Sequence, residues 1–210
     1  MLDLNPVEIR VLGCLIEKQR TTPDAYPLTL NSLRLACNQS TNRDPVVEYD
    51  EHTIRGALER LARRRYVRLA SGHTTRATKY RHLLDDTLQL DREELAVLAV
   101  LMLRGPQTPG ELRQRTERLQ RFSGHEALDA VLTRLAERDF IERLERRPGQ
   151  KEQRYRLKLD DDTETAPEPA VPATSHQSPV TEFDDRLERL EREVAELRRE
   201  LADLREQLGA

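Results

Sequence analysis

The feature that most constrains this fold is an internal repeat in which a helix leads directly into two short strands. Residues 50–84 open with Asp50, a predicted N-cap, and carry apolar side chains at helical spacing, as at Ile54, Leu58 and Leu61. An extended segment, a polar turn and a second extended segment follow. The plan returns over residues 123–159, where LTRLA matches LERLA of the first copy. A helix followed by a hairpin is typical of the second half of a winged helix. We therefore expect a mainly α fold with small β-hairpins (α+β), built from two winged helix-turn-helix domains in tandem.

Helix start signals divide this region into two similar parts. The first part opens with Asn5-Pro6-Val7-Glu8 and the second with Asp91-Arg92-Glu93-Glu94, each an N-cap side chain followed by a carboxylate at the third helical position. Thr108-Pro109-Gly110-Glu111 and Ser123-Gly124-His125-Glu126 are predicted capping boxes for the later helices of the second part. The first winged-helix domain is expected over residues 1–86 and the second over residues 87–159.

The remaining residues predict a linker and a coiled coil. Residues 160–182 are rich in Asp and Pro, which favours an extended, disordered segment. Residues 183–210 follow, and their apolar positions alternate spacings of four and three through Phe183, Leu187, Leu190, Val194, Leu197, Leu201, Leu204 and Leu208. In a parallel pair the flanking charges attract, as Arg186 does with Glu191. A parallel homodimer is therefore predicted, while a solitary amphipathic helix or one that docks on the domains stays open.

Charge and cysteine content narrow the class of protein. Residues 1–159 hold 29 Lys and Arg against 23 Asp and Glu, a net +6, while residues 160–210 hold 6 against 15, a net −9. Cys14 and Cys37 lie among apolar residues of predicted helices, so we interpret them as core residues of a cytoplasmic protein. No apolar run approaches the ~20 residues that cross a bilayer, so no membrane partner is expected.

Catalytic chemistry is not expected from this sequence. The five histidines are scattered without the paired spacing of a metal site, and no glycine-rich loop joins a strand to a helix. Asp24 with Tyr26, or Asn38 with Arg43, are better explained by turn-forming and capping roles. We therefore predict a protein that is not an enzyme and that holds no cofactor or metal.

The third helix of the first domain is the candidate DNA-reading element. A 100° step per residue turns a basic face outward, with three arginines against one glutamate, and the following hairpin adds further cations. The residues predicted to bind DNA are His52, Arg55, Arg60, Arg63, His73, Arg76 and Lys79. In the second copy the matching helix face is acidic and would be repelled by phosphate; its residues are Glu126, Asp129, Ala130, Thr133, Arg134 and Glu137.

Several long motifs resemble the YceH family of uncharacterised bacterial proteins. They are TTPDAYPLTLNSL at 21–33, ACNQ at 36–39, NRDP at 42–45, LRGPQTPGELR at 103–113 and RPGQKE at 147–152. The resemblance covers residues 3–159 and implies a pair of winged-helix domains, in agreement with the repeat. It implies no activity, and it does not extend to the linker or the coiled coil.

Two functions remain open at this point. One is a dimeric DNA-binding regulator that contacts DNA mainly through the first domain. The other is a protein-interaction adaptor of the tandem winged-helix type without specific DNA readout, which would bind a protein partner at the acidic face of the second domain. A net charge of +6 over residues 1–159 fits either function.

Overall fold

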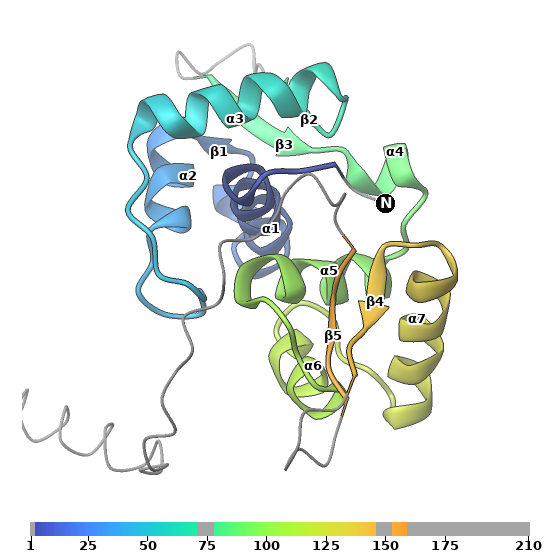
Figure 1. Cartoon of the computed structure of the whole chain (residues 1–210). Helices are drawn as coiled ribbons and strands as arrows, with labels where there is room; N and C mark the ends of the chain where they lie inside the picture. Colours follow the sequence, from blue (N-terminus) through green and yellow to red (C-terminus); the bar gives the residue numbers. More distant parts are fainter. Residues whose placement is uncertain (1–2, 71–77, 146–152, 159–210) are drawn as a thin grey trace, which may run out of the picture. The chain divides into compact units, whose positions relative to one another are not determined.

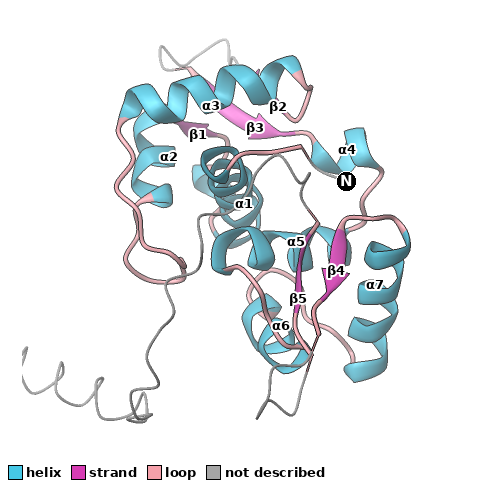
Figure 2. Cartoon of the chain, viewed as in Figure 1, coloured by secondary structure: helices cyan, strands magenta, loops and turns pink. Residues whose placement is uncertain are grey.

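The computed structural model describes residues 3–70, 78–145 and 153–158, which form a mixed α+β structure with small antiparallel sheets (Figure 1). Helices dominate, as the sequence predicts (Figure 2). The first half contains α1 (Pro6–Thr21), a short 3-10 helix (Pro23–Ala25), β1 (Leu28–Thr29), α2 (Leu30–Cys37), α3 (Glu51–Arg63), β2 (Val67–Ala70) and β3 (Lys79–His82). Its three strands are antiparallel in the order β1-β3-β2.

The second half repeats this order of elements, as the sequence repeat predicts. After a connecting helix, α4 (Leu84–Leu88), come α5 (Arg92–Arg104), α6 (Pro109–Thr116), α7 (His125–Glu137), β4 (Ile141–Arg143) and β5 (Tyr155–Leu157). Even β1 has a counterpart: Leu28 pairs with Tyr80 of β3, and an isolated bridge joins Gln107 to Tyr155 of β5. The two halves therefore share one topology, although their strands differ in length.

Most of the predicted helix caps are confirmed. Side chains accept hydrogen bonds from first-turn N–H groups at four of the predicted N-caps, namely Asn5, Asp50, Asp91 and Thr108. The predicted capping box at Ser123 is wrong, because α7 begins one residue later with Gly124 at the N-cap and no side-chain cap hydrogen bond. This start leaves Ser123 outside the helix and places Glu126 at its second position, where its carboxylate cannot close a capping box.

The core is centred on the packing of α1 against α5 (Figure 1). Gly13 is the point of closest approach, since a Cβ atom built there would lie 2.9 Å from Leu103 Cγ and 2.9 Å from Met102 Cβ. A side chain at this position would hold the two helices apart. Glycine is therefore required here by packing between helices and not by the backbone conformation of α1.

Helix α5 is buried on all sides, which the sequence did not predict. The 3.6-residue period of its sequence predicts a core face of Leu95, Leu98, Ala99 and Met102, but the residues between them, such as Val97 and Val100, are also buried. The reason is that α5 contacts α6, α7 and β5 of its own half and α1 of the other half. A helix that is apolar all round belongs in the middle of a structure.

All of the described residues belong to one compact unit. The predicted boundary between residues 86 and 87 falls inside α4, and whether the two halves fold separately stays a prediction. The predicted linker at 160–182 and coiled coil at 183–210 lie outside the described residues. Within the described part of the chain, no helix is both long enough and apolar enough to cross a membrane.

Cys14 and Cys37 are free and buried, which confirms their interpretation as core residues. Cys14 belongs to α1 and Cys37 ends α2, so both thiols fill space where these two helices pack. No group of three or more His, Cys, Asp or Glu side chains suited to a metal occurs in residues 3–70, 78–145 and 153–158.

Candidate nucleic-acid interface

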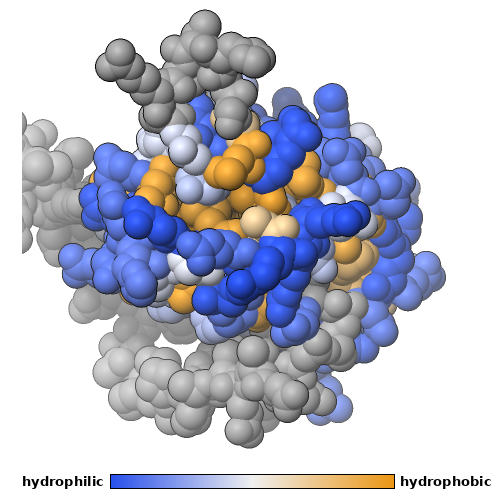
Figure 3. Space-filling model, turned by 90° about the horizontal axis from the view of Figure 1, so that it is seen from above, coloured by the Kyte–Doolittle hydropathy of each residue, from blue (hydrophilic) through white to orange (hydrophobic). Residues whose placement is uncertain are grey.

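Helix α3 lies at the surface of the first half with its predicted core face in place (Figure 1). Its N-cap, Asp50, accepts a 2.7 Å hydrogen bond from the Thr53 backbone N–H, and Ile54, Leu58 and Leu61 are buried against the core. His52, Arg55, Glu59 and Arg63 are exposed on the opposite face. Seen from above, the molecule presents many hydrophilic side chains with hydrophobic ones between them (Figure 3).

The exposed arginines of α3 differ in their surroundings. Arg55 lies 3.9 Å from Glu51 one turn earlier, and both side chains are more than half exposed, so this pair stabilises the helix only slightly. Arg63 has no ion-pair partner within the described residues. It is therefore the α3 cation best placed to bind a phosphate.

Arg60 does not point freely outward as the helical period predicted. Its Nε donates a 2.6 Å hydrogen bond to Oε1 of Glu8, a side chain that is only 2% exposed. Arg64 approaches the other oxygen of Glu8 at 3.8 Å and binds Asp3 at 2.6 Å. The long arginine side chain lets Arg60 reach α1 from the edge of the outward face, so its charge is already compensated.

The same arrangement occurs in the second half, which identifies it as structural. Glu94, buried at the start of α5, lies 3.6 Å from Arg134 and 3.1 Å from Arg138. Glu8 and Glu94 are each the third helical residue of a capping box. Their arginine partners match, since Arg60 lies in α3 and Arg134 in α7, while Arg64 and Arg138 are the C-caps of these helices. The same glutamate and arginine positions occur in both copies of the repeat. This match was the sequence signal that could have predicted an ion pair for Arg60 and so distinguished it from the exposed cations.

The hairpin β2–β3 presents cations that sequence reasoning only partly identified. The register places Arg68 directly opposite Arg81. Lys79 lies two residues before Arg81 in β3, so both side chains are on the same side of the sheet. None of these three has an ion-pair partner among the residues described. Like charges directly opposite each other destabilise a strand pair, so an unpaired Arg–Arg pair is costly unless an anion binds there.

The second hairpin has a neutral pair at the matching position. There the register places Glu142 opposite Arg156, and Arg156 Nε donates a 2.5 Å hydrogen bond to Glu142 Oε1. The two halves thus share a backbone plan but differ in charge: the first hairpin carries two cations where the second carries an ion pair. This difference could not be found by composition, because both hairpins are rich in arginine.

The predicted acidic face of α7 is also in place. Glu126, Asp129 and Glu137 are exposed and have no ion-pair partner within the described part of the chain. Arg134, the cation of this face, is held by Asp91 at 2.9 Å and by Glu94. The exposed charge of α7 is therefore negative and opposite in sign to that of the first hairpin.

Several predicted functional residues lie outside the described residues. They are the hairpin residues His73 and Arg76 and the dimerisation residues Leu187, Leu190, Val194, Leu197, Leu201, Leu204 and Leu208. Their roles stay predictions. Arg63 ends α3, and the cationic hairpin follows it in the same half of the molecule. Arg68 belongs to this hairpin although the sequence analysis did not single it out.

A buried polar cluster lies behind the first hairpin, and within it the Nδ1 atom of His82 lies 3.7 Å from Asp85 Oδ1. His82 is 1% exposed, its Nε2 lies 2.7 Å from Gln19 Oε1, and its backbone N–H donates a 2.9 Å hydrogen bond to the Tyr26 hydroxyl. Burial lowers the pKa of His82 to about 4, against a partial opposing effect of Asp85, and burial raises the pKa of Tyr26 to about 12. Both side chains are therefore neutral at neutral pH and serve to anchor β3.

Asn38 and Arg43 both have partners that fix local structure. Asn38 exchanges hydrogen bonds with the Tyr49 backbone at 2.8 and 2.9 Å, and Arg43 forms a two-bond pair with Glu17 at 2.6 and 3.1 Å. Arg43 also donates to the carbonyl of Ala36. These contacts fix the long connection between α2 and α3, in agreement with the turn-forming role predicted from the sequence.

Comparison with known proteins gives family matches over most of the chain. Residues 4–150 match the family model described as "Protein of unknown function, DUF480". A UPF0502 protein of Aeromonas hydrophila is 45% identical over 199 residues, covering 92% of this chain and 90% of that relative. UPF0502 proteins of Koribacter versatilis and Geobacter sulfurreducens are 47% and 46% identical, covering 92% and 91% of this chain and 89% and 88% of the relatives. Their descriptions name no activity. The limit of the resemblance to residues 3–159 is therefore wrong, because these matches cover more of the chain than that range contains.

Proposed function

Since this chain belongs to the DUF480 family, the same UPF0502 family that includes YceH, and the family's description assigns no activity, we propose a function from the chain's own geometry. The protein is a DNA-binding protein, a dimeric regulator that contacts DNA mainly through its first half. The two halves are winged helices, an interpretation supported by the repeated order of three helices and a hairpin with a third strand or bridge beside it.

The observation that carries this proposal is the Arg68–Arg81 pair across the first hairpin. Two guanidinium groups on neighbouring strands, with Lys79 on the same sheet face, form a site that a phosphate oxygen would neutralise. Arg63 adds a cation at the end of α3, which immediately precedes this hairpin. Phosphate contacts of this kind position a protein on DNA and make its affinity depend on salt.

The second half supplies the test of this site. Replacing Arg68 by glutamate would reproduce in the first hairpin the Glu–Arg pair that Glu142 and Arg156 form in the second. The variant is expected to fold at least as stably as the wild type, because an attractive cross-strand pair is worth ~0.2–1 kcal/mol and replaces a repulsive one. It is expected to lose DNA affinity, and each lost phosphate contact lowers the slope of log K against log salt by about 0.9.

The measurement is fluorescence anisotropy of the full chain with a mixed-sequence DNA duplex over a series of salt concentrations. Arg156→Gln in the second hairpin is the control, since it removes a cation that is already paired, and Arg68→Gln is measured with it because it also removes a single charge. If Arg68→Glu and Arg156→Gln weaken binding equally, or if the wild type shows no salt-dependent binding, the first hairpin is not a DNA contact.

The exposed acidic face of α7 favours a second candidate function, a protein-interaction adaptor. Glu126, Asp129 and Glu137 would bind a basic surface or helix of a protein partner. The fluorescence anisotropy titration with DNA distinguishes the two functions, because an adaptor without DNA affinity shows no binding even at low salt. Replacing these three acids by their amides would then weaken partner binding and leave thermal stability unchanged.

A further inference from the structure

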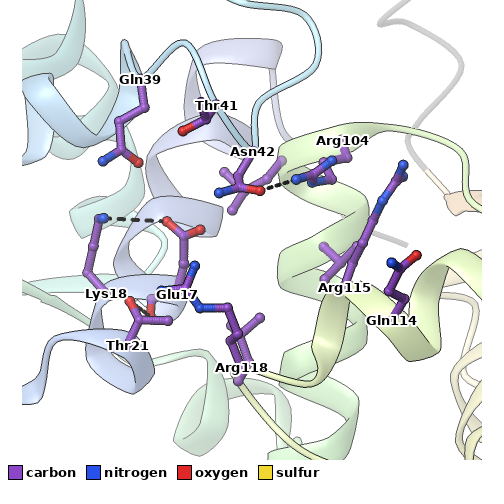
Figure 4. A pocket seen from close by; sticks show the side chains of 13 residues that line it. Glu17, Lys18, Thr21, Gln39, Thr41, Asn42, Arg104, Gln114, Arg115 and Arg118 are labelled. Carbon is purple, nitrogen blue, oxygen red and sulfur yellow. Dashed lines mark hydrogen bonds and ion pairs between the residues drawn. The ribbon is translucent and has the colours of Figure 1, made fainter. Parts of the chain in front are cut away.

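A cavity of about 580 Å³ lies between elements of both halves of the folded unit (Figure 4). Its walls come from α1, the connection between α2 and α3, α5, and α6 with the turn that follows it. The charged residues of the wall are Glu17, Lys18, Arg104, Arg115 and Arg118. Cavities of this size hold small molecules, and an opening between packed elements is a common place for such a site.

The sole carboxylate of this wall is already neutralised. Glu17 accepts two hydrogen bonds from the buried guanidinium of Arg43, at 2.6 and 3.1 Å. The Lys18 ammonium is 3.9 Å from Glu17, too far for a strong hydrogen bond. The charges of Glu17 and Arg43 therefore neutralise each other. Glu17 does not neutralise the other cations that line the cavity.

The arginines of the opposite wall have few partners. Arg115 lies 3.4 Å from Glu111 on the same helix, and Arg104 donates a hydrogen bond to the neutral Asn42 side chain. Within the described residues neither Arg104 nor Arg118 has an ion-pair partner. Burial, followed by the charges of Arg115 and Arg43, lowers the pKa of Arg104 below its ordinary value. The positive charges of Arg104 and Arg115 therefore repel each other at this wall.

Hydrogen-bonding groups complete the lining. Figure 4 shows Lys18 and Thr21 of α1 on one side of the cavity and Arg115 and Gln114 of α6 on the other, with the Asn42 side chain directed at Arg104. Guanidinium groups match phosphate geometry with two parallel hydrogen bonds, and the amides and hydroxyl supply neutral donors and acceptors beside them. The wall has too many polar groups for an apolar ligand.

We propose that this cavity binds a small phosphorylated molecule, with its phosphate between the cations of α1 and those of α5 and α6. The ligand would bridge the two halves of the unit, because Lys18 belongs to the first half and Arg104, Arg115 and Arg118 belong to the second. This site is separate from the proposed DNA contact, which lies on α3 and the first hairpin.

The test uses the full chain with inorganic pyrophosphate as the probe, in isothermal titration calorimetry and thermal unfolding at constant ionic strength set with chloride. The double variant Arg115→Gln/Arg118→Gln is expected to lose about 100-fold or more in affinity, since each charged hydrogen bond lost corresponds to roughly a tenfold or larger change. The single variant Arg115→Gln is measured beside Arg113→Gln as its charge-matched control, because each removes one cation from α6 and Arg113 is exposed and does not line the cavity.

The outcomes separate the cavity from general charge and from the DNA contact. Binding that is lost in the double variant and kept in Arg113→Gln and Arg68→Glu supports the proposal. Absence of pyrophosphate binding to the wild type, equal loss in Arg113→Gln, or full binding by the double variant would overturn it. Unliganded melting temperatures show that each variant is folded before its affinity is compared.

Discussion

Replacing Gly13 by alanine tests the packing of α1 against α5. The added Cβ atom would lie 2.9 Å from both Leu103 Cγ and Met102 Cβ, whereas carbon atoms in favourable contact are ~3.5–4.0 Å apart. Met102 Cβ is attached directly to the α5 backbone, so the contact is relieved only if the two helices move apart. Overpacking of this kind costs ~1–3 kcal/mol.

A second glycine within a helix provides the control for this change. A Cβ atom at Gly56 of α3 would meet nothing nearer than Arg60 Nη1 at 3.5 Å, an ordinary contact with a side chain. Both substitutions gain the helix preference of alanine over glycine, ~1 kcal/mol. Gly56→Ala is therefore expected to stabilise the protein. The free energy of unfolding of Gly13→Ala is expected to be lower than that of Gly56→Ala by the overpacking cost of ~1–3 kcal/mol.

The measurement is urea unfolding of the full chain, followed by far-UV circular dichroism, for the wild type and both variants. The quantity of interest is the difference between the two variants, in which the helix preference cancels. If Gly13→Ala is stabilised as much as Gly56→Ala, then α1 and α5 do not approach as closely as described and the argument for the shared core fails.

Three further predictions concern the core, pH and the tail. Leu58 of α3 and Leu132 of α7 are buried at matching positions, so replacing either by alanine should lower the free energy of unfolding by ~2–5 kcal/mol in urea titrations. No change would mean that the core-facing side of that helix has been assigned wrongly. Burial lowers the pKa of His82 in the folded protein to about 4. The stability that comes from keeping this side chain neutral is therefore complete above about pH 6.5, and ~3 kcal/mol of it is lost as the pH falls toward 4. A His82→Gln variant should have a flatter stability curve over this pH range, and an equally steep curve would assign the loss to other groups. Leu190→Asp with Leu197→Asp should convert the proposed dimer to a monomer in sedimentation, whereas a wild-type monomer would exclude the coiled-coil dimer.

The sequence by itself determined the elements and their order. Caps at Asn5, Asp50, Asp91 and Thr108 and the 3.6-residue period located the helices closely, because these signals act between residues three or four positions apart. The internal repeat predicted that both halves share one plan. Ser123 shows the limit of such signals, since a one-residue shift of the helix start removes its capping role.

Only the tertiary structure decided which side chains meet. The period placed Arg60 and Arg63 on one outward face, but a flexible arginine reaches whatever carboxylate lies within its length, and Glu8 is 52 residues away in the chain. The opposition of Arg68 and Arg81 depends on strand register, and the cationic cavity depends on how α1 packs against α5. These contacts join distant parts of the chain, and their geometry is fixed by close packing of the core, whose shape no local pattern specifies.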